Sequence, residues 1–107
     1  MDAQFKKGIL DLCVLSILEK KEIYGYGLKM EISALMDVNE NTLYPLLRRL
    51  EKDGYVKTST HQSEQGRTRK YYFITDEGKS HLQTQRIEWR AFKEAADSLI
   101  EGVYEDE

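Results

Sequence analysis

Apolar residues recur along this chain at helical spacing in four places, and two short segments between them have the composition of β-strands. Residues 4–20 are apolar on nearly all sides, which predicts a helix that must be covered on more than one face. Residues 21–24 are expected to form a turn. A second helix, ending near Asp37, is predicted by apolar residues three or four positions apart: Leu28, Ile32 and Leu35.

A third helix is predicted to end at Gly54, a residue suited to the backbone conformation that closes a helix. Asn39 or Asn41 can cap its start. With Asn41 as the cap, Pro45 costs only the first intrahelical bond, whereas with Asn39 a bend is expected. Its inward stripe is Leu43, Leu46, Leu47 and Leu50, and Tyr44, Arg48, Arg49 and Lys52 fall on or near the opposite face.

Two strands and a long helix complete the predicted order. Residues 55–60 and 70–75 are rich in β-branched and aromatic residues, and the polar stretch from His61 to Arg69 is expected to be the hairpin tip. A last helix is predicted over residues 76–101, with Thr75 as its cap. A seven-residue pattern in that helix, called the seam below, is typical of a helix that pairs with another helix; it comprises Leu82, Gln85, Trp89, Phe92, Ala96, Leu99 and Val103.

This order of elements indicates an α+β, mostly helical fold: a winged helix-turn-helix with a C-terminal dimerisation helix. We expect residues 1–75 to form a winged helix-turn-helix DNA-binding domain and residues 76–107 to form the dimerisation helix and an acidic tail. At 107 residues the core is small, so oligomerisation would stabilise it.

The charge distribution favours a nucleic-acid partner although the net charge is −3. Residues 40–75 carry seven bases and four acids, a balance of +3, while residues 76–107 carry four bases and nine acids, a balance of −5. Phosphate contacts depend on the local field rather than on the total charge. The sequence therefore predicts that one face of the protein meets double-stranded DNA and that the other faces away.

Cationic and hydroxyl side chains on the third helix and the hairpin are the candidate DNA contacts. Taken alone, the helix cations favour a solvated surface with Glu51 and Asp53 as partners, but a basic helix followed by a basic hairpin tip matches phosphate positioning by two neighbouring elements. Tyr24 and Tyr26, beside Gly25 and Gly27, either join them or pack in the core. The candidate set is Tyr24, Tyr26, Asn41, Thr42, Tyr44, Arg48, Arg49, Lys52, Arg67, Arg69 and Lys70.

Catalysis and metal binding have little support in the sequence. Cys13, the single cysteine, sits in an apolar run and reads as a buried small hydrophobe, with a reactive thiol as the alternative. The two histidines are not placed to form a nucleophile–base pair or a zinc site. We therefore expect no enzyme activity, no metal and no cofactor, no membrane association, and a cytoplasmic location.

Two motifs together resemble the PadR family of transcriptional regulators. Residues 41–56, NTLYPLLRRLEKDGYV, look like the recognition-helix signature of that family, and residues 66–78, GRTRKYYFITDEG, look like its wing and the start of its dimerisation helix. The resemblance covers most of the chain and points to the short form with a single C-terminal helix. It implies a homodimer that usually represses transcription and is often released by a small aromatic or drug-like ligand.

Trp89 has two interpretations. Either it packs in the core of a dimer, or it lines a pocket for a flat apolar ligand. The second interpretation is similar to the multidrug-responsive members of the family, in which a pair of tryptophans holds planar compounds. The predicted pocket and dimer residues are Phe5, Ile9, Leu12, Trp89, Phe92, Ala96 and Leu99.

The sequence thus predicts a ligand-responsive, homodimeric repressor that binds operator DNA, with a planar aromatic molecule as its effector. The alternative is a winged helix used for protein–protein contact without specific DNA binding.

Overall fold

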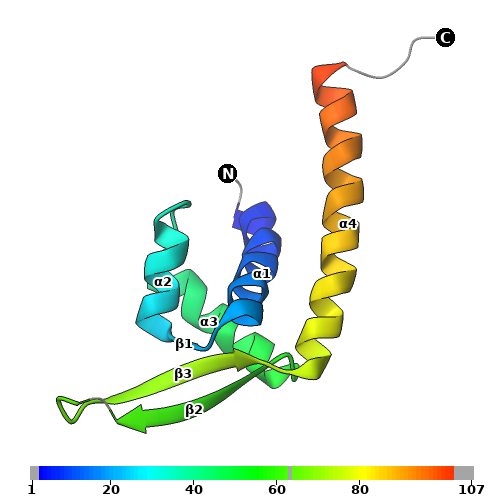
Figure 1. Ribbon diagram of the computed structural model, residues 1–107. Coiled ribbons are helices and arrows are strands. Elements are labelled where there is room, and N and C mark those ends of the chain that lie inside the picture. The colour runs from blue at the N-terminus through cyan, green and yellow to red at the C-terminus, as the bar shows by residue number, and fades with distance from the viewer. Residues whose placement is uncertain (1–2, 63, 103–107) are drawn as a thin grey trace.

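Four helices and a small antiparallel sheet make up the computed structural model, which describes residues 3–62 and 64–102 and the side chains of residues 8–62 and 64–102. Three helices cluster on one face of the sheet, and the fourth leaves the sheet and projects beyond the cluster (Figure 1). The winged helix predicted from the sequence is confirmed. The elements are α1 (Ala3–Lys20), β1 (Ile23–Tyr24), α2 (Gly25–Ser33), α3 (Glu40–Lys52), β2 (Val56–Gln62), β3 (Thr68–Ile74) and α4 (Asp76–Glu101).

The predicted turn over residues 21–24 is wrong in its second half. Ile23 and Tyr24 form β1, which pairs with Tyr72 and Tyr71 of β3, so the sheet has the order β1-β3-β2. A strand of two residues is too short to show an alternating pattern, and it exists only because β3 offers it an open edge.

Helix α2 ends at Ser33 rather than near Asp37 as predicted. The chain tightens there, because the Leu35 amide donates to the Ile32 carbonyl at 3.0 Å, a bond between residues three apart. Leu35, at helical spacing from Ile32, lies beyond the helix and is 92% exposed. Its position in the pattern was therefore misleading: Leu35 is not part of the core.

Helix α3 is capped by Asn39, whose side-chain oxygen accepts a hydrogen bond from the Thr42 amide at 3.1 Å. The alternative cap, Asn41, is wrong, because that residue lies inside the first turn. Pro45 consequently stands in the helix interior and has no N–H to donate to the carbonyl of Asn41. At the other end Gly54 adopts a φ of +84°, the conformation that the sequence predicts for this position.

The hairpin of β2 and β3 is longer than predicted. The strands pair from Val56 opposite Ile74 to Gln62 opposite Thr68, so His61 and Arg69, which were expected in the tip, face each other in the ladder. This part of the hairpin extends away from the core and is polar on both faces, so no alternation of apolar residues marks it as strand.

Thr75 caps α4 as predicted, since its hydroxyl oxygen accepts a hydrogen bond from the Gly78 amide at 3.0 Å. The same hydroxyl donates to the Gly54 carbonyl at 2.6 Å. In the described part of the chain, no helix is long and apolar enough to cross a membrane.

The core joins the helix cluster to the inner face of the sheet. Its buried hydrophobic residues are Leu10, Val14, Leu15, Leu18, Leu28, Ile32, Val38, Leu43, Leu46, Leu47, Leu50, Val56, Tyr72 and Leu82.

Candidate nucleic-acid interface and the groove at Trp89

The cations of α3 divide between two sides of the helix. Arg48 and Lys52 are exposed and form no ion pair with another described residue. Arg49 instead points to α1, where its guanidinium lies 2.7 Å from Oδ1 of Asp11, a carboxylate that is 15% exposed. The hydrogen bond to Asp11 raises the pKa of Arg49 above its ordinary value. The prediction that Arg49 faces outward with Arg48 is therefore wrong, because α1 offers it a half-buried carboxylate.

Tyr44 is also drawn inward. It is half-buried, and its ring lies so close to Gly25 at the start of α2 that a Cβ there would be 3.0 Å from Cε1 of the tyrosine. Gly27 is equally close to Ile23, because a Cβ added to Gly27 would lie 3.0 Å from Cγ1 of Ile23. A side chain thus packs closely against the backbone at both glycines, where a larger residue would be crowded.

A hollow of about 270 Å³ lies where α2 begins, between α3 and the sheet. It brings together residues 24–26, residue 44 and residues 69–72, and Lys70 and Tyr26 at its rim are exposed. Its lining holds two cations and four phenols: Tyr24, Gly25, Tyr26, Tyr44, Arg69, Lys70 and Tyr72.

The two cations of this hollow are positioned by aromatic rings and by one carboxylate. The guanidinium of Arg69 lies 4.5 Å from the centre of the Tyr24 ring, and the ammonium of Lys70 lies 5.6 Å from that of Tyr72. Lys70 is also 3.9 Å from Glu51 on α3. Tyr24 and Tyr26 both line this hollow and neither is among the buried core residues, and their contact with DNA stays a prediction.

The start of α2 adds amide groups to the same place. Tyr24, its N-cap, has an extended backbone and no side-chain cap hydrogen bond. The first-turn amides of a helix carry partial positive charge and are suited to an anion. Phenol hydroxyls, cations and helix amides are together the groups that hold a phosphate.

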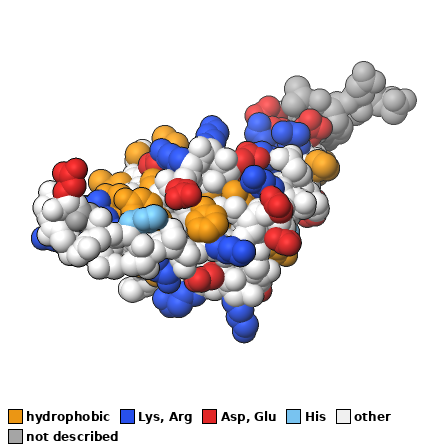
Figure 2. All heavy atoms as spheres, turned by 60° about the horizontal axis from the view of Figure 1, so that its bottom comes forward, with side chains coloured by type: hydrophobic (Ala, Val, Ile, Leu, Met, Phe, Trp, Pro, Cys, Tyr) orange, Lys and Arg blue, Asp and Glu red, His pale blue; other side chains and the backbone are white. Residues whose placement is uncertain are grey.

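The hairpin tip carries the remaining cation of the predicted set. Arg67 is exposed and follows Gly66, which adopts a φ of +79° that favours glycine. The ribbon behind the tip is stiffened by packed aromatic rings, since Tyr71 contacts His61 at 5.0 Å and Tyr24 at 5.7 Å between ring centres. Figure 2 views the molecule from the side of the sheet, where blue cationic side chains project along the lower margin.

Trp89 is half-buried between two hollows. The smaller, of about 440 Å³, lies between α1 and α4 and is lined by Gly8, Ile9, Leu12, Gln85, Glu88, Trp89 and Phe92. It contains four of the seven residues predicted for a pocket. Of the other three, Ala96 and Leu99 do not line it, and the side chain of Phe5 is outside the described part of the structure. Val103, at the end of the predicted seam, is also outside.

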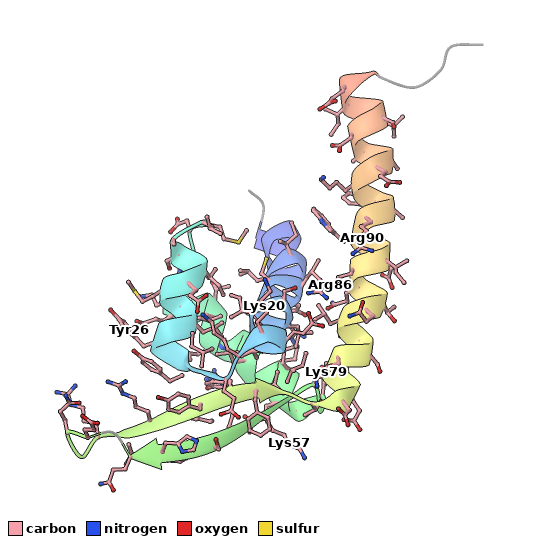
Figure 3. The ribbon with its side chains drawn as sticks, viewed as in Figure 1. Lys20, Tyr26, Lys57, Lys79, Arg86 and Arg90 are labelled. Carbon is pink, nitrogen blue, oxygen red and sulfur yellow. The ribbon has the colours of Figure 1, made fainter. Side chains whose placement is uncertain are left out.

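The larger hollow, of about 480 Å³, lies between α1, α2 and α4 and was missed from the sequence. Its lining includes Cys13, which is half-buried, and the pKa of the Cys13 thiol is raised by burial, so the reactive thiolate is disfavoured. Arg86 in its wall is paired with Glu19 of α1 at 3.0 Å. No periodicity identifies such a site, because its residues come from three elements that only the packing brings together. Arg86 and Arg90, one turn apart on α4, are labelled in Figure 3.

A helix-turn-helix followed by a basic antiparallel hairpin defines a winged-helix regulator. Residues 14–84 match the family model of the transcriptional regulator PadR-like family, and the chain belongs to this family. It is a transcriptional regulator, the class that the sequence predicts in place of an enzyme.

Relatives with and without solved structures agree with this assignment. The chain is 33% identical over 100 residues to the transcriptional regulator Rv3488 of Mycobacterium tuberculosis, covering 92% of this chain and 90% of that protein. The crystal structure of a PadR-like transcriptional regulator from Bacillus cereus is similar with a TM-score of 0.82 at 33% identity, over 92% of this chain and 97% of the other. The negative transcriptional regulator PadR of Bacillus subtilis is 28% identical over 78 residues, covering 69% of this chain and 43% of that protein.

Proposed function

We propose that this regulator binds operator DNA as a homodimer, with α3 in the major groove and the β2–β3 hairpin on the flanking backbone. The observation that carries this proposal is the basic hollow, in which Arg69, Lys70 and the open start of α2 converge beside α3. In a winged helix these elements lie where the DNA backbone passes the recognition helix. Arg48 and Lys52, exposed on α3, are then the cations that face the groove.

The domain division follows from the same proposal. Residues 1–75 form the DNA-binding part, and α4 with the acidic tail serves dimerisation. Two recognition helices in a symmetric dimer must match half-sites about 34 Å apart. We propose repression as the direction of regulation, because the related PadR of Bacillus subtilis is a negative transcriptional regulator. A cytoplasmic location accompanies this function as a prediction.

A mobility shift with the DNA upstream of its own gene, with and without competitor DNA, separates this function from the alternative of a protein-interaction module. A regulator that binds an operator retains its labelled fragment under an excess of unrelated DNA. An interaction module with an incidentally basic surface loses the fragment at the same competitor concentration, and that result would contradict the proposal.

Replacing Arg67 at the hairpin tip by alanine is expected to weaken binding to operator and unrelated DNA alike. The reason is that a phosphate contact carries no sequence information, and each lost contact lowers the slope of log K against log salt by about one unit. Fluorescence anisotropy over a salt series measures that slope. Lys93→Ala, which removes an exposed cation from the far half of α4, is the matched control. An unchanged slope for Arg67→Ala would exclude tip contact.

We further propose that the hollow between α1 and α4 receives a planar aromatic effector against Trp89 and Phe92. Their rings lie 6.3 Å apart and tilted by 41°, beside the half-buried aliphatic side chains of Ile9 and Leu12. A ligand that favours a different arrangement of the two subunits would shift the population away from the form that docks both α3 helices.

Planar dyes are expected to quench the fluorescence of Trp89, the single tryptophan, in a saturable manner. Titration of the protein with such dyes, and repetition with Phe92→Leu, tests this ligand site directly, since loss of one ring should weaken the quenching. If the parent protein shows no dye response while Trp89→Ala loses dimerisation, Trp89 has a packing role only.

A further inference from the structure

One polar atom of Gln85, on α4, is buried without a partner. The side-chain oxygen Oε1 of this residue accepts no hydrogen bond from any residue in the described part of the chain. Most buried polar atoms of folded proteins are paired, because an unpaired acceptor has lost its hydrogen bonds to water without replacement. The surroundings of Gln85 on α4 indicate what could supply the missing donor.

Gln85 lies in the wall of the hollow between α1 and α4, where the two helices run side by side (Figure 1). Trp89 and Phe92 follow it at four and seven positions, so all three residues share one face of α4, and all three line the hollow. On the α1 side the hollow is lined by Ile9 and Leu12, which are half-buried. The amide of Gln85 thus stands among aromatic and aliphatic side chains.

The other polar side chain in this lining is a carboxylate. Glu88 is exposed at the hollow and forms no ion pair with another described residue. A carboxylate only accepts hydrogen bonds, and the lining described for this hollow contains no lysine or arginine. The larger hollow beyond Trp89 differs, because Arg86 and Arg90 line it. The hollow between α1 and α4 is therefore suited to a ligand that donates hydrogen bonds and carries no negative charge.

We propose that Gln85 determines the specificity of the effector site by accepting a hydrogen bond from an O–H or N–H group on the ring of a planar aromatic ligand. The role of Gln85 rests on the proposed effector site between α1 and α4 and names the class of molecule that fills it. That class comprises neutral or cationic aromatic donors, such as phenols and aromatic amines, rather than bare aromatic hydrocarbons or aromatic carboxylates.

The position of Gln85 lets it read the edge of a ligand ring. It lies one helical turn before Trp89, about 6 Å along the axis of α4, so a ligand packed on the indole ring brings its edge near the amide. The last torsion of a glutamine side chain has broad minima, so the oxygen can turn to follow a donor. A site built around an acceptor of this kind rejects a ligand that cannot pair with it, because the acceptor then stays unsatisfied.

A matched pair of probes tests the hydrogen bond. 2-Naphthol carries one O–H donor on a planar ring, and 2-methoxynaphthalene has the same ring with the donor blocked. In equilibrium dialysis the parent protein is expected to bind 2-naphthol about five- to tenfold more tightly, the range for one net hydrogen bond. Gln85→Leu should remove this preference, whereas Gln85→Glu, which keeps an acceptor oxygen, should retain it. Trp89 emission reports that each variant is folded.

The possible outcomes separate the role of Gln85 from the effector site itself. A parent protein that binds neither probe overturns the proposed site and the role of Gln85 together. A parent that binds both probes equally leaves the site standing and overturns the role of Gln85. A Gln85→Leu variant that still prefers 2-naphthol would show that another group accepts the hydrogen bond, which also overturns it.

A third probe tests the charge of the ligand. 2-Naphthoate replaces the hydroxyl by a carboxylate and is expected to bind more weakly than 2-naphthol, because Glu88 repels it and no base lines the hollow. Glu88→Gln should narrow the difference. If 2-naphthoate bound more tightly than 2-naphthol to the parent protein, the proposed ligand class would be wrong.

The unpaired oxygen also predicts an effect in the absence of any ligand. Gln85→Leu is expected to raise the melting temperature by roughly 4–8 °C, because it removes an unsatisfied buried acceptor from a small domain. Gln83→Leu is the matched control: its side chain is exposed and donates to Glu19 at 3.4 Å, so its replacement should bring no such gain. A Gln85→Leu variant no more stable than the parent would show that the amide is already paired in the free protein, and would overturn its role in binding.

Discussion

Replacing Gly78 by alanine is expected to destabilise the protein by about 3 kcal/mol, a large part of the stability of so small a domain. A Cβ at this position would overlap the carbonyl oxygen of Tyr55 and would lie 2.7 Å from Cγ1 of Ile74. The carbonyl has little freedom to move, since it accepts a hydrogen bond from the Thr75 amide at 3.0 Å. The Tyr55 ring is held as well, stacked on His81 at 4.1 Å between centres.

Urea unfolding measures this effect, and Gly8 provides the matched control. Gly8 lies within α1, and a Cβ there meets no atom within 4 Å. Gly8→Ala is expected to stabilise the protein by about 0.5–1 kcal/mol, because glycine is a poor helix former. If Gly78→Ala unfolds at the same urea concentration as the parent, the start of α4 is not fixed against β2 in this way. The direction in which α4 leaves the domain would then have another cause.

Arg48→Ala and Arg49→Ala change adjacent positions on α3 but are expected to impair different properties, operator binding in the first variant and stability in the second. Arg48 is exposed on the side proposed to meet DNA, so its loss should weaken operator binding roughly tenfold or more and leave thermal stability unchanged. Arg49 is hydrogen-bonded to Asp11 on α1, so its loss should lower the free energy of unfolding by about 1–2 kcal/mol, the range for a charged hydrogen bond discounted for the exposure of the guanidinium.

Asp11→Asn distinguishes a structural from a DNA-contacting role for Arg49. It removes the negative charge without touching α3, and it should reproduce much of the stability loss of Arg49→Ala. Anisotropy with operator DNA and thermal unfolding of all three variants make the comparison. If Arg49→Ala alone lost operator affinity at full stability, the guanidinium would be a DNA contact and its pairing with Asp11 would be incidental.

Local signals in the sequence were sufficient for most of the elements. The cap at Thr75, the positive φ at Gly54 and the four buried leucines of α3 all follow from interactions within a few residues, and all are confirmed. Two of the errors share one source. Tyr24 in β1 and Arg69 in the extended β3 depend on pairing with residues far along the chain, which no local pattern records.

The candidate site shows the same division. The sequence identified which residue types are available, including the cations of the hairpin and the phenols near α2. It did not separate Arg48 from Arg49, because both lie on the polar side of the same helix and only the position of Asp11 on α1 decides between them.

What the sequence by itself determined is the family, the order of helices and strands, and the residues with the chemistry to contact DNA, because periodicity, capping and motif spacing are local properties. What only the tertiary structure decided is the grouping of Tyr24, Tyr44 and Arg69 around one hollow, the inward turn of Arg49 and the larger hollow between α1, α2 and α4. These features depend on packing between elements distant in the chain, and packing is settled by the whole core at once rather than by any one segment.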